Sequence, residues 1–285
     1  MRLIFCGEDG FSAQVLESLI LDNHEVLGVF CPLYDNNIYA RLNLICKKHY
    51  IDFYRINDIN SSTIEKIIRA LDPDLIVVCH FEKILKKNII DLPHYGCINL
   101  HPSLLPKYRG LSPQHWPIIN GDDETGITVH FINEGIDTGP IIVQKKIKIA
   151  PDMYVADLQM KMLGIYKYIV KDAVKLLRDD RIKPSSQYAS NGSYYGKLKE
   201  NQCNINLEDS YIKAYNLIRG VSEPYLGARL HSYQIWKASL ATKELNEKIR
   251  SRYDINDLYF DDELGALIKF NDGNLIVKKY NTINK

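Results

Sequence analysis

The stretch that most constrains the fold is the uninterrupted apolar run Leu75-Ile76-Val77-Val78-Cys79. A strand with one face in water alternates apolar and polar residues, whereas a strand covered on both faces of a parallel sheet is apolar throughout. This run therefore predicts a strand inside a layered α/β domain. The segment from Arg2 to Gly7 has the same character and predicts a second buried strand.

Segments with helical spacing alternate with strand-like segments through the first half of the chain. The periodicity predicts helices over 11–21, 38–49 and 64–71, and further strands over 26–31 and 97–100. Strands that alternate with helices predict an α/β fold with a doubly wound, mostly parallel sheet. Such sheets bind ligands beyond the carboxyl ends of their strands.

The second half predicts a change of architecture. An alternating segment over 125–132 predicts a strand, residues 141–144 and 145–149 predict an antiparallel pair, and 155–177 predict a long helix. Polar, turn-rich residues between 180 and 202 then predict a boundary. We expect one domain over 1–182 and a smaller, mostly β C-terminal domain over 203–285, which opens with a helix over 207–221.

Composition narrows the function classes. The 285 residues are 46% hydrophobic and 25% charged with a net charge of +1, which is typical of a soluble globular protein and does not favour nucleic acid or membrane partners. No apolar run approaches the roughly 20 residues of a membrane helix, and we expect no signal peptide. The six cysteines form no CxxC pair, which favours free thiols in a reducing cytoplasm and predicts no metal site.

Three side chains carry the chemistry that we predict. Asn99 and His101 end a predicted strand, and Asp137 follows His101 by 36 positions. An amide and an imidazolium can stabilise a developing oxyanion, and a carboxylate can orient the imidazole and handle protons, which suits acyl transfer without a covalent enzyme intermediate. We expect Asp137 to raise the pKa of His101 above its ordinary value of roughly 6.5. Taken singly, each residue could instead serve a turn.

Residues 96–144 resemble the 10-formyltetrahydrofolate-dependent formyltransferase family, and the segment from Ile218 to Ala228, with its Pro-aromatic-x-Gly-Ala run, looks most like the members that act on nucleotide-linked amino sugars. The matching motifs are Asn99-x-His101-Pro102-Ser103-Leu104-Leu105-Pro106, Tyr108-Arg109-Gly110, Gly126-Ile127-Thr128-Val129-His130 and Gly135-Ile136-Asp137-Thr138-Gly139.

This resemblance implies a Rossmann-like formyltransferase fold in which Asn99, His101 and Asp137 form the catalytic triad. It also implies 10-formyltetrahydrofolate as the co-substrate, tetrahydrofolate as its product and a folate pocket in the first domain. The expected folate-binding residues are Phe81, Lys83, Ile84, Leu85, Ser103, Leu104, Gly135 and Ile136.

Five further residues are candidates for binding the acceptor. Glu8 and Asp9 follow the first strand, where the family's turn often borders the acceptor, and Lys107 and Arg109 could each contact a phosphate or remain solvated charges. Tyr225 could stack on a base or fill a core. We expect His130, on an alternating strand, to be a packed or hydrogen-bonded histidine.

The acceptor itself is less defined by the sequence. A tRNA-binding domain should be basic, but residues 200–285 hold 12 Lys and Arg against 12 Asp and Glu. This balance favours a dTDP-, UDP- or GDP-linked amino-deoxy sugar, of the kind found in lipopolysaccharide O-antigen biosynthesis, over methionyl-tRNA. A catalytically silent folate- or nucleotide-sugar-binding module is the remaining alternative. The resemblance also implies a homodimer, while the nucleotide, the sugar and the amine position stay open.

Overall fold

The structure is a computed structural model that describes residues 1–283, and it divides into two compact units. The first unit comprises Met1–Gly110, Gly126–Ile147 and Lys161–Tyr194. The second comprises Leu111–Thr125, Lys148–Met160 and the chain from Tyr195 onward.

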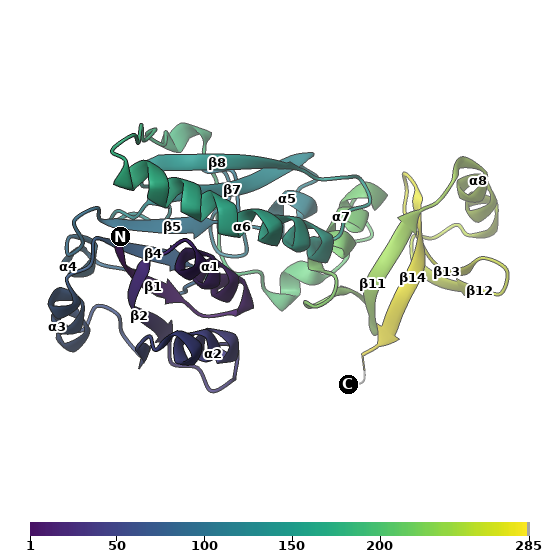
Figure 1. Cartoon of the computed structure of the whole chain (residues 1–285). Helices are drawn as coiled ribbons and strands as arrows, with labels where there is room; N and C mark the ends of the chain where they lie inside the picture. The colour runs from purple at the N-terminus through teal and green to yellow at the C-terminus, as the bar shows by residue number, and fades with distance from the viewer. Residues whose placement is uncertain (284–285) are drawn as a thin grey trace. The chain divides into compact units, whose positions relative to one another are not determined.

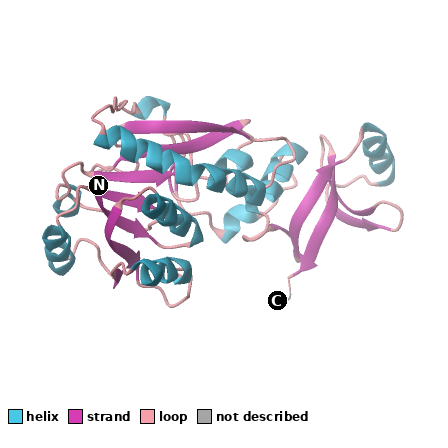
Figure 2. Ribbon diagram, in the orientation of Figure 1, coloured by secondary structure: helices cyan, strands magenta, loops and turns pink. Residues whose placement is uncertain are grey.

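The first unit is built on a seven-stranded sheet with the strand order β3-β2-β1-β4-β5-β7-β8 (Figures 1 and 2). Its strands are β1 (Arg2–Gly7), β2 (Glu25–Pro32), β3 (Phe53–Ile56), β4 (Leu75–Cys79), β5 (Cys97–His101), β7 (Glu124–Phe131) and β8 (Ile141–Lys148). The pairs among β1 to β5 are parallel, and β7 runs antiparallel to β5. The predicted mostly parallel sheet is confirmed.

Helices connect these strands and cover the sheet (Figure 1). They are α1 (Gly10–Leu21), α2 (Ala40–His49), α3 (Ser62–Leu71), α4 (Lys87–Ile90) and α6 (Val155–Arg178). The local sequence sets where they begin: Asp9 caps α1 by accepting the backbone N–H groups of Phe11 and Ser12, and Ser61 accepts the N–H of Ile64 at the start of α3.

β4 occupies the centre of the sheet and is buried along its whole length. Ile76 and Val78 pack in one cluster with apolar residues of α3 and α4, so the alternate residues face the opposite side of the sheet. Burial of both faces of β4 explains its unbroken apolar run. The parallel pairing of β4 with β5 places the carboxyl ends of these two strands side by side.

Two details differ from the sequence expectation. The predicted antiparallel pair within 141–149 is wrong, because β8 is one continuous strand from Ile141 to Lys148. β8 is the edge of the sheet, and Lys145 and Lys146 are exposed there, as charged residues on edge strands commonly are. The short strand β3 was not predicted, since four residues offer little periodicity.

The second unit contains a five-stranded antiparallel sheet with the order β10-β11-β14-β13-β12. Its elements are α5 (Trp116–Ile119), α7 (Tyr211–Val221), β10 (Ala228–Leu230), β11 (Tyr233–Leu240), α8 (Lys243–Arg252), β12 (Leu258–Asp261), β13 (Gly265–Lys269) and β14 (Asn274–Thr282). α7 and the sheet share one buried apolar cluster, which confirms the small, mostly β C-terminal part. No helix in the described residues is long and apolar enough to span a membrane.

Candidate functional site

The pairing of β5 with β7 assembles the first part of the candidate site. Asn99 lies directly opposite His130, and His101 lies opposite Thr128. Residues two apart on a strand share a face, so these four side chains emerge from one face of the strand pair. The amide nitrogen of Asn99 lies 3.3 Å from Nε2 of His130.

A tight loop after β7 brings the carboxylate to the same place. The Asn133 side chain accepts hydrogen bonds from the N–H of Gly135 and the hydroxyl of Thr138, which closes the loop on itself. A Cβ on Gly135 would lie 2.2 Å from the Thr138 hydroxyl, so the loop requires glycine there. Asp137 follows in the left-handed region with φ of 52°. This loop delivers its side chain into the site.

The Asp137 carboxylate is the centre of the arrangement. Its Oδ2 accepts the N–H of Gly110 at 2.8 Å and lies 3.6 Å from Nδ1 of His101. Its Oδ1 lies 3.4 Å from the Asn99 amide nitrogen and 3.6 Å from Nε2 of His130. The three predicted catalytic residues are therefore brought together, with His130 as a fourth member.

The tautomer of His101 follows from its neighbours. Its Nε2 lies 2.8 Å from the carbonyl oxygen of Tyr108, which can only accept, so Nε2 carries the proton. Burial lowers the pKa of His101 below its ordinary value, and Asp137 only partly offsets that effect. The expected upward shift is wrong because desolvation of a 4% exposed imidazole outweighs the nearby carboxylate.

For Asp137, the neighbouring groups have a larger effect on the pKa than burial has. Burial alone would raise its pKa, but the two histidines and the Gly110 N–H together hold that pKa far below its usual range. The carboxylate therefore stays ionised through the neutral pH range, and Nδ1 of His101 is unprotonated beside it. A carboxylate next to a bare imidazole nitrogen favours transfer of a proton to that nitrogen.

A small pocket of about 100 Å³ adjoins these residues. It is lined by Val78, Lys83, Ile84, Leu85, Asn99, His130, Ile132, Asn133, Gly135, Ile136 and Asp137. Five of the predicted folate-binding residues are in this set. Of the others, Phe81 packs on the core between the sheet and α3, Ser103 is fully buried with its hydroxyl donated to the Lys107 carbonyl, and Leu104 packs at Gly126.

Glu8 and Asp9 lie at the carboxyl end of β1 and are both engaged within the first unit. Glu8 accepts the hydroxyl of Tyr34 at 2.7 Å, and burial raises the pKa of its carboxyl. Asp9 caps α1 through Oδ1 and lies 3.0 Å from Nδ1 of His80 through Oδ2. Their predicted role in acceptor binding stays a prediction.

The remaining predicted acceptor residues lie in different surroundings. Lys107 is exposed, whereas the Arg109 side chain is buried and donates to Gln187. Tyr225 belongs to the second unit, where its ring packs against His115 and its hydroxyl bonds the Gln159 amide. Tyr225 is half-buried, and its two predicted roles, stacking on a base and filling a core, both stay predictions.

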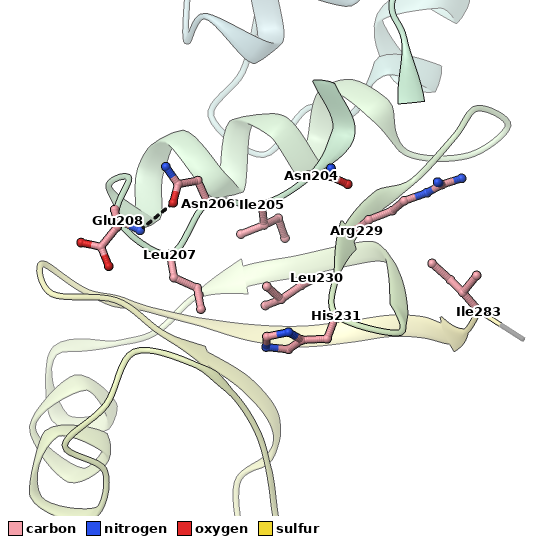
Figure 3. Close-up of a pocket in the computed structure, with 9 residues that line it drawn as sticks. All are labelled: Asn204, Ile205, Asn206, Leu207, Glu208, Arg229, Leu230, His231 and Ile283. Atoms are coloured by element: carbon pink, nitrogen blue, oxygen red, sulfur yellow. Dashed lines mark hydrogen bonds between the residues drawn. The ribbon is translucent and has the colours of Figure 1, made fainter. Parts of the chain in front are cut away.

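A second, larger hollow of about 600 Å³ lies in the second unit (Figure 3). Its lining comes from the loop 204–208, from β10 and the turn after it, and from Ile283. Arg229 lies 3.1 Å from a Glu200 oxygen and His231 lies 2.6 Å from an Asp257 oxygen, so both side chains already contact carboxylates of the same unit. We therefore assign no ligand to this hollow. Within the described residues, no group of three or more His, Cys, Asp or Glu could hold a metal ion.

Comparison with known proteins identifies the family. Residues 34–173 match the formyl transferase family. The chain is 32% identical to the methionyl-tRNA formyltransferase of Alkaliphilus oremlandii over 256 residues, covering 87% of this chain and 83% of that relative. It is 34% identical to the corresponding enzyme of Trichlorobacter lovleyi over 227 residues, covering 78% and 72%. The chain belongs to the formyl transferase family and is a formyl-transferring enzyme.

Solved structures share the fold over the whole chain. WlaRD, a sugar 3N-formyl transferase solved with dTDP and 5-N-formyl-THF, superposes with a TM-score of 0.75 at 22% identity, covering 100% of this chain and 98% of that one. The N-formyltransferase of Helicobacter canadensis, solved with folinic acid and dTDP-3-aminofucose, gives 0.77 at 21% identity, covering 99% and 100%. The predicted formyltransferase fold is confirmed.

The geometry predicts the effect of removing single groups. We expect Asn99→Ala, His101→Asn and Asp137→Asn each to lower the turnover of formyl transfer by roughly 10²- to 10³-fold, as loss of one oxyanion-stabilising group does in other acyl-transfer enzymes. Steady-state kinetics with a matched thermal unfolding curve would test this, and the exposed His94→Asn provides the control. Turnover near that of the wild type in any of the three would remove that residue from the predicted triad.

The lowered pKa of His101 predicts how stability depends on pH. The unfolded chain binds a proton on this imidazole more readily than the folded one, so the free energy of unfolding should fall as pH drops through roughly 6.5. Urea unfolding between pH 8 and about pH 5.5 would measure the slope. The slope should be smaller in His101→Asn but unchanged in His94→Asn; equal slopes in all three proteins would show that His101 is not held neutral by burial.

Proposed function

We propose that this enzyme transfers the formyl group of 10-formyltetrahydrofolate to the amine of a nucleotide-linked amino-deoxy sugar. The two structural neighbours described above were solved with formylated folates, and one of them with dTDP-3-aminofucose. The pocket beside Asn99 and Asp137 supports a folate donor at that end of the site. Six buried free thiols agree with a reducing cytoplasm, where we place the enzyme.

The observation that carries the choice of acceptor is the charge balance of residues 200–285. A tRNA-binding surface needs unpaired basic side chains that can displace counterions from phosphates. Here the basic residues from 200 onward are balanced in number by acidic ones, and several form ion pairs. The paired residues are Lys213, Arg229, Lys248, Arg252 and Lys279. Arg219 and Lys269 are buried and donate to backbone carbonyls.

Methionyl-tRNA formyl transfer is the second candidate, and one observation favours it. Several relatives that cover most of the chain at about 30% identity are methionyl-tRNA formyltransferases. A formyltransferase acting on either acceptor uses the same donor and the same transfer chemistry, so overall identity at this level does not decide between the two acceptors. A small nucleotide sugar remains the better match to the balanced charge of residues 200–285.

The chemistry begins with an uncharged amine on the acceptor. Its nitrogen attacks the formyl carbon, and the carbonyl oxygen gains negative charge in a tetrahedral intermediate. The bond from carbon to folate N10 then breaks, and its electron pair passes to N10. Overall one proton moves from the attacking amine to N10, so tetrahydrofolate and the N-formyl product leave without an acylated enzyme residue.

The site residues take defined parts in this sequence. The unprotonated Nδ1 of His101 accepts the amine proton, and the imidazolium is stabilised by Asp137 at 3.6 Å. That cation and the Asn99 amide compensate the charge on the oxyanion, where preorganised donors have their largest effect. The contacts of Asn99 are long, at 3.3 and 3.4 Å, and we expect them to shorten when the donor is bound.

The acceptor is tested by direct competition. We expect formyl transfer from 10-formyltetrahydrofolate to one member of a panel of dTDP-, UDP- and GDP-linked 3-amino and 4-amino sugars, and none to charged initiator tRNA. Mass spectrometry of the products identifies the sugar and the amine. Turnover on tRNA alone would overturn the proposed acceptor while leaving the formyltransferase activity intact.

We also propose a homodimer formed through the second unit. Tyr233, Phe260 and Tyr280 form an aromatic cluster with ring centroids 5.1 to 5.9 Å apart, and Phe260 is 50% exposed. In contrast, Tyr253 and Tyr259 stack on each other and pack on the buried Ile249 cluster. An exposed aromatic cluster is typical of an interface.

Light scattering after size exclusion tests this proposal. We expect a dimer for the wild type and a monomer for Phe260→Asp, because a carboxylate placed in an apolar interface loses its hydration. Tyr50→Asp, at a fully exposed site in the first unit, should remain a dimer. A wild-type monomer at micromolar concentration would contradict the proposal.

A further inference from the structure

A buried arginine lies one residue before the Gly110 N–H that binds Asp137. Arg109 is only 9% exposed, and its Nε and Nη2 both donate to the side-chain oxygen of Gln187, at 3.2 and 2.9 Å. A guanidinium that donates twice to the amide oxygen holds that end of the amide toward the arginine, so the amide nitrogen faces the other way. The orientation of the Gln187 side chain is therefore set by Arg109.

The other end of the Gln187 amide holds the Asp137 loop. Its Nε2 donates to the carbonyl oxygens of Asp137 at 3.0 Å and of Gly139 at 2.7 Å. Asp137 is in the left-handed region, which is unfavourable for a residue with a side chain unless its surroundings fix it. Two hydrogen bonds from one amide supply that constraint on the backbone.

Gln187 reaches the loop because the chain after α6 folds back on the segment after β5. The N–H of Arg109 donates to the Ser193 carbonyl at 2.9 Å, and the N–H of Ser193 donates to the Pro106 carbonyl at 3.1 Å. The Ser193 hydroxyl also accepts the N–H of Tyr108 at 2.9 Å. These bonds hold residues 187–193 alongside 106–109.

We propose that Gln187, oriented by Arg109, is a positioning residue that sets the Asp137 carboxylate for formyl transfer. Adjacent residues then hold Asp137 at both ends: Gly110 binds its carboxylate directly, and Arg109 binds its backbone through Gln187. Arg109 acts in this way rather than on an acceptor phosphate. The inference rests on the proposed catalytic role of Asp137.

The test replaces the donating amide by an acid of the same size. Gln187→Glu keeps the acceptor for Arg109 but turns a carboxylate oxygen toward two carbonyl oxygens, so the loop should move and the Gly110 bond to Asp137 should weaken. We expect the Gly110 amide proton to exchange with solvent faster by about tenfold or more, as for loss of a hydrogen bond to a charged group. Turnover with dTDP-3-aminofucose as the probe acceptor should fall by up to about 100-fold, with little change in acceptor KM.

Asn246→Asp is the matched control, because this amide also accepts a side-chain bond on its oxygen and donates to a backbone carbonyl, but within the second unit. It should leave both readouts unchanged. If Gln187→Glu fails to fold, Arg109→Lys, which retains the charge but loses the paired bonds, should give the same faster exchange.

The positioning role of Gln187 and the catalytic role of Asp137 are tested by different outcomes. Unchanged Gly110 exchange in Gln187→Glu would overturn the positioning role, whatever the acceptor. Loss of the Gly110 bond without loss of formyl transfer, together with an active Asp137→Asn, would instead overturn the proposed role of Asp137.

Discussion

The ionised carboxylate of Asp137 is buried among Asn99, His101 and His130, and the rest of the site depends on how its charge is compensated there. Removing a carboxylate from water costs several kcal/mol unless fixed donors replace the lost hydration. The N–H of Gly110 at 2.8 Å and the dipoles of the surrounding side chains provide that replacement. The same compensation leaves the carboxylate available to stabilise an imidazolium during proton transfer.

The fold provides these donors from segments that are far apart in sequence. Parallel pairing with β4 places the carboxyl end of β5, with Asn99 and His101, at the edge of the sheet where the site lies. The antiparallel β7 places His130 beside Asn99. The segment after α6 then binds the Asp137 loop through Gln187. Because β4 is packed on both faces, it gives this edge of the sheet a rigid support. The Asn99 amide and the His101 imidazole are therefore held in fixed positions beside the site. Residues 200–285 hold as many acidic as basic side chains, and on this balance we propose a small acceptor rather than a polyanion.

Local sequence patterns predict the α/β fold and the three catalytic residues. The contacts of His130 and Gln187 depend on which distant segments pair with each other, and local patterns do not predict that. The motifs around His101 and Asp137 are short and specific, so the three predicted catalytic residues were found and the structure brings them together. The sequence predicts His130 only as a packed or hydrogen-bonded histidine and not as a neighbour of Asn99, because its position opposite Asn99 depends on the β5–β7 register, which no local pattern encodes. Gln187 lies in a polar, turn-rich segment and carried no signal of its own. The predicted direction of the His101 pKa shift was wrong because burial cannot be measured from neighbours in sequence.

The ionisation of Asp137 can be measured directly. Carboxyl ¹³C NMR of the wild type and Asp137→Asn identifies its signal, which can then be followed as pH is lowered. The structure predicts a signal that shows no titration down to about pH 4, since its pKa lies below the ordinary value of about 3.9. A carboxyl that titrates at or above that value would contradict the account, because the charge that organises the site would then not be stabilised there.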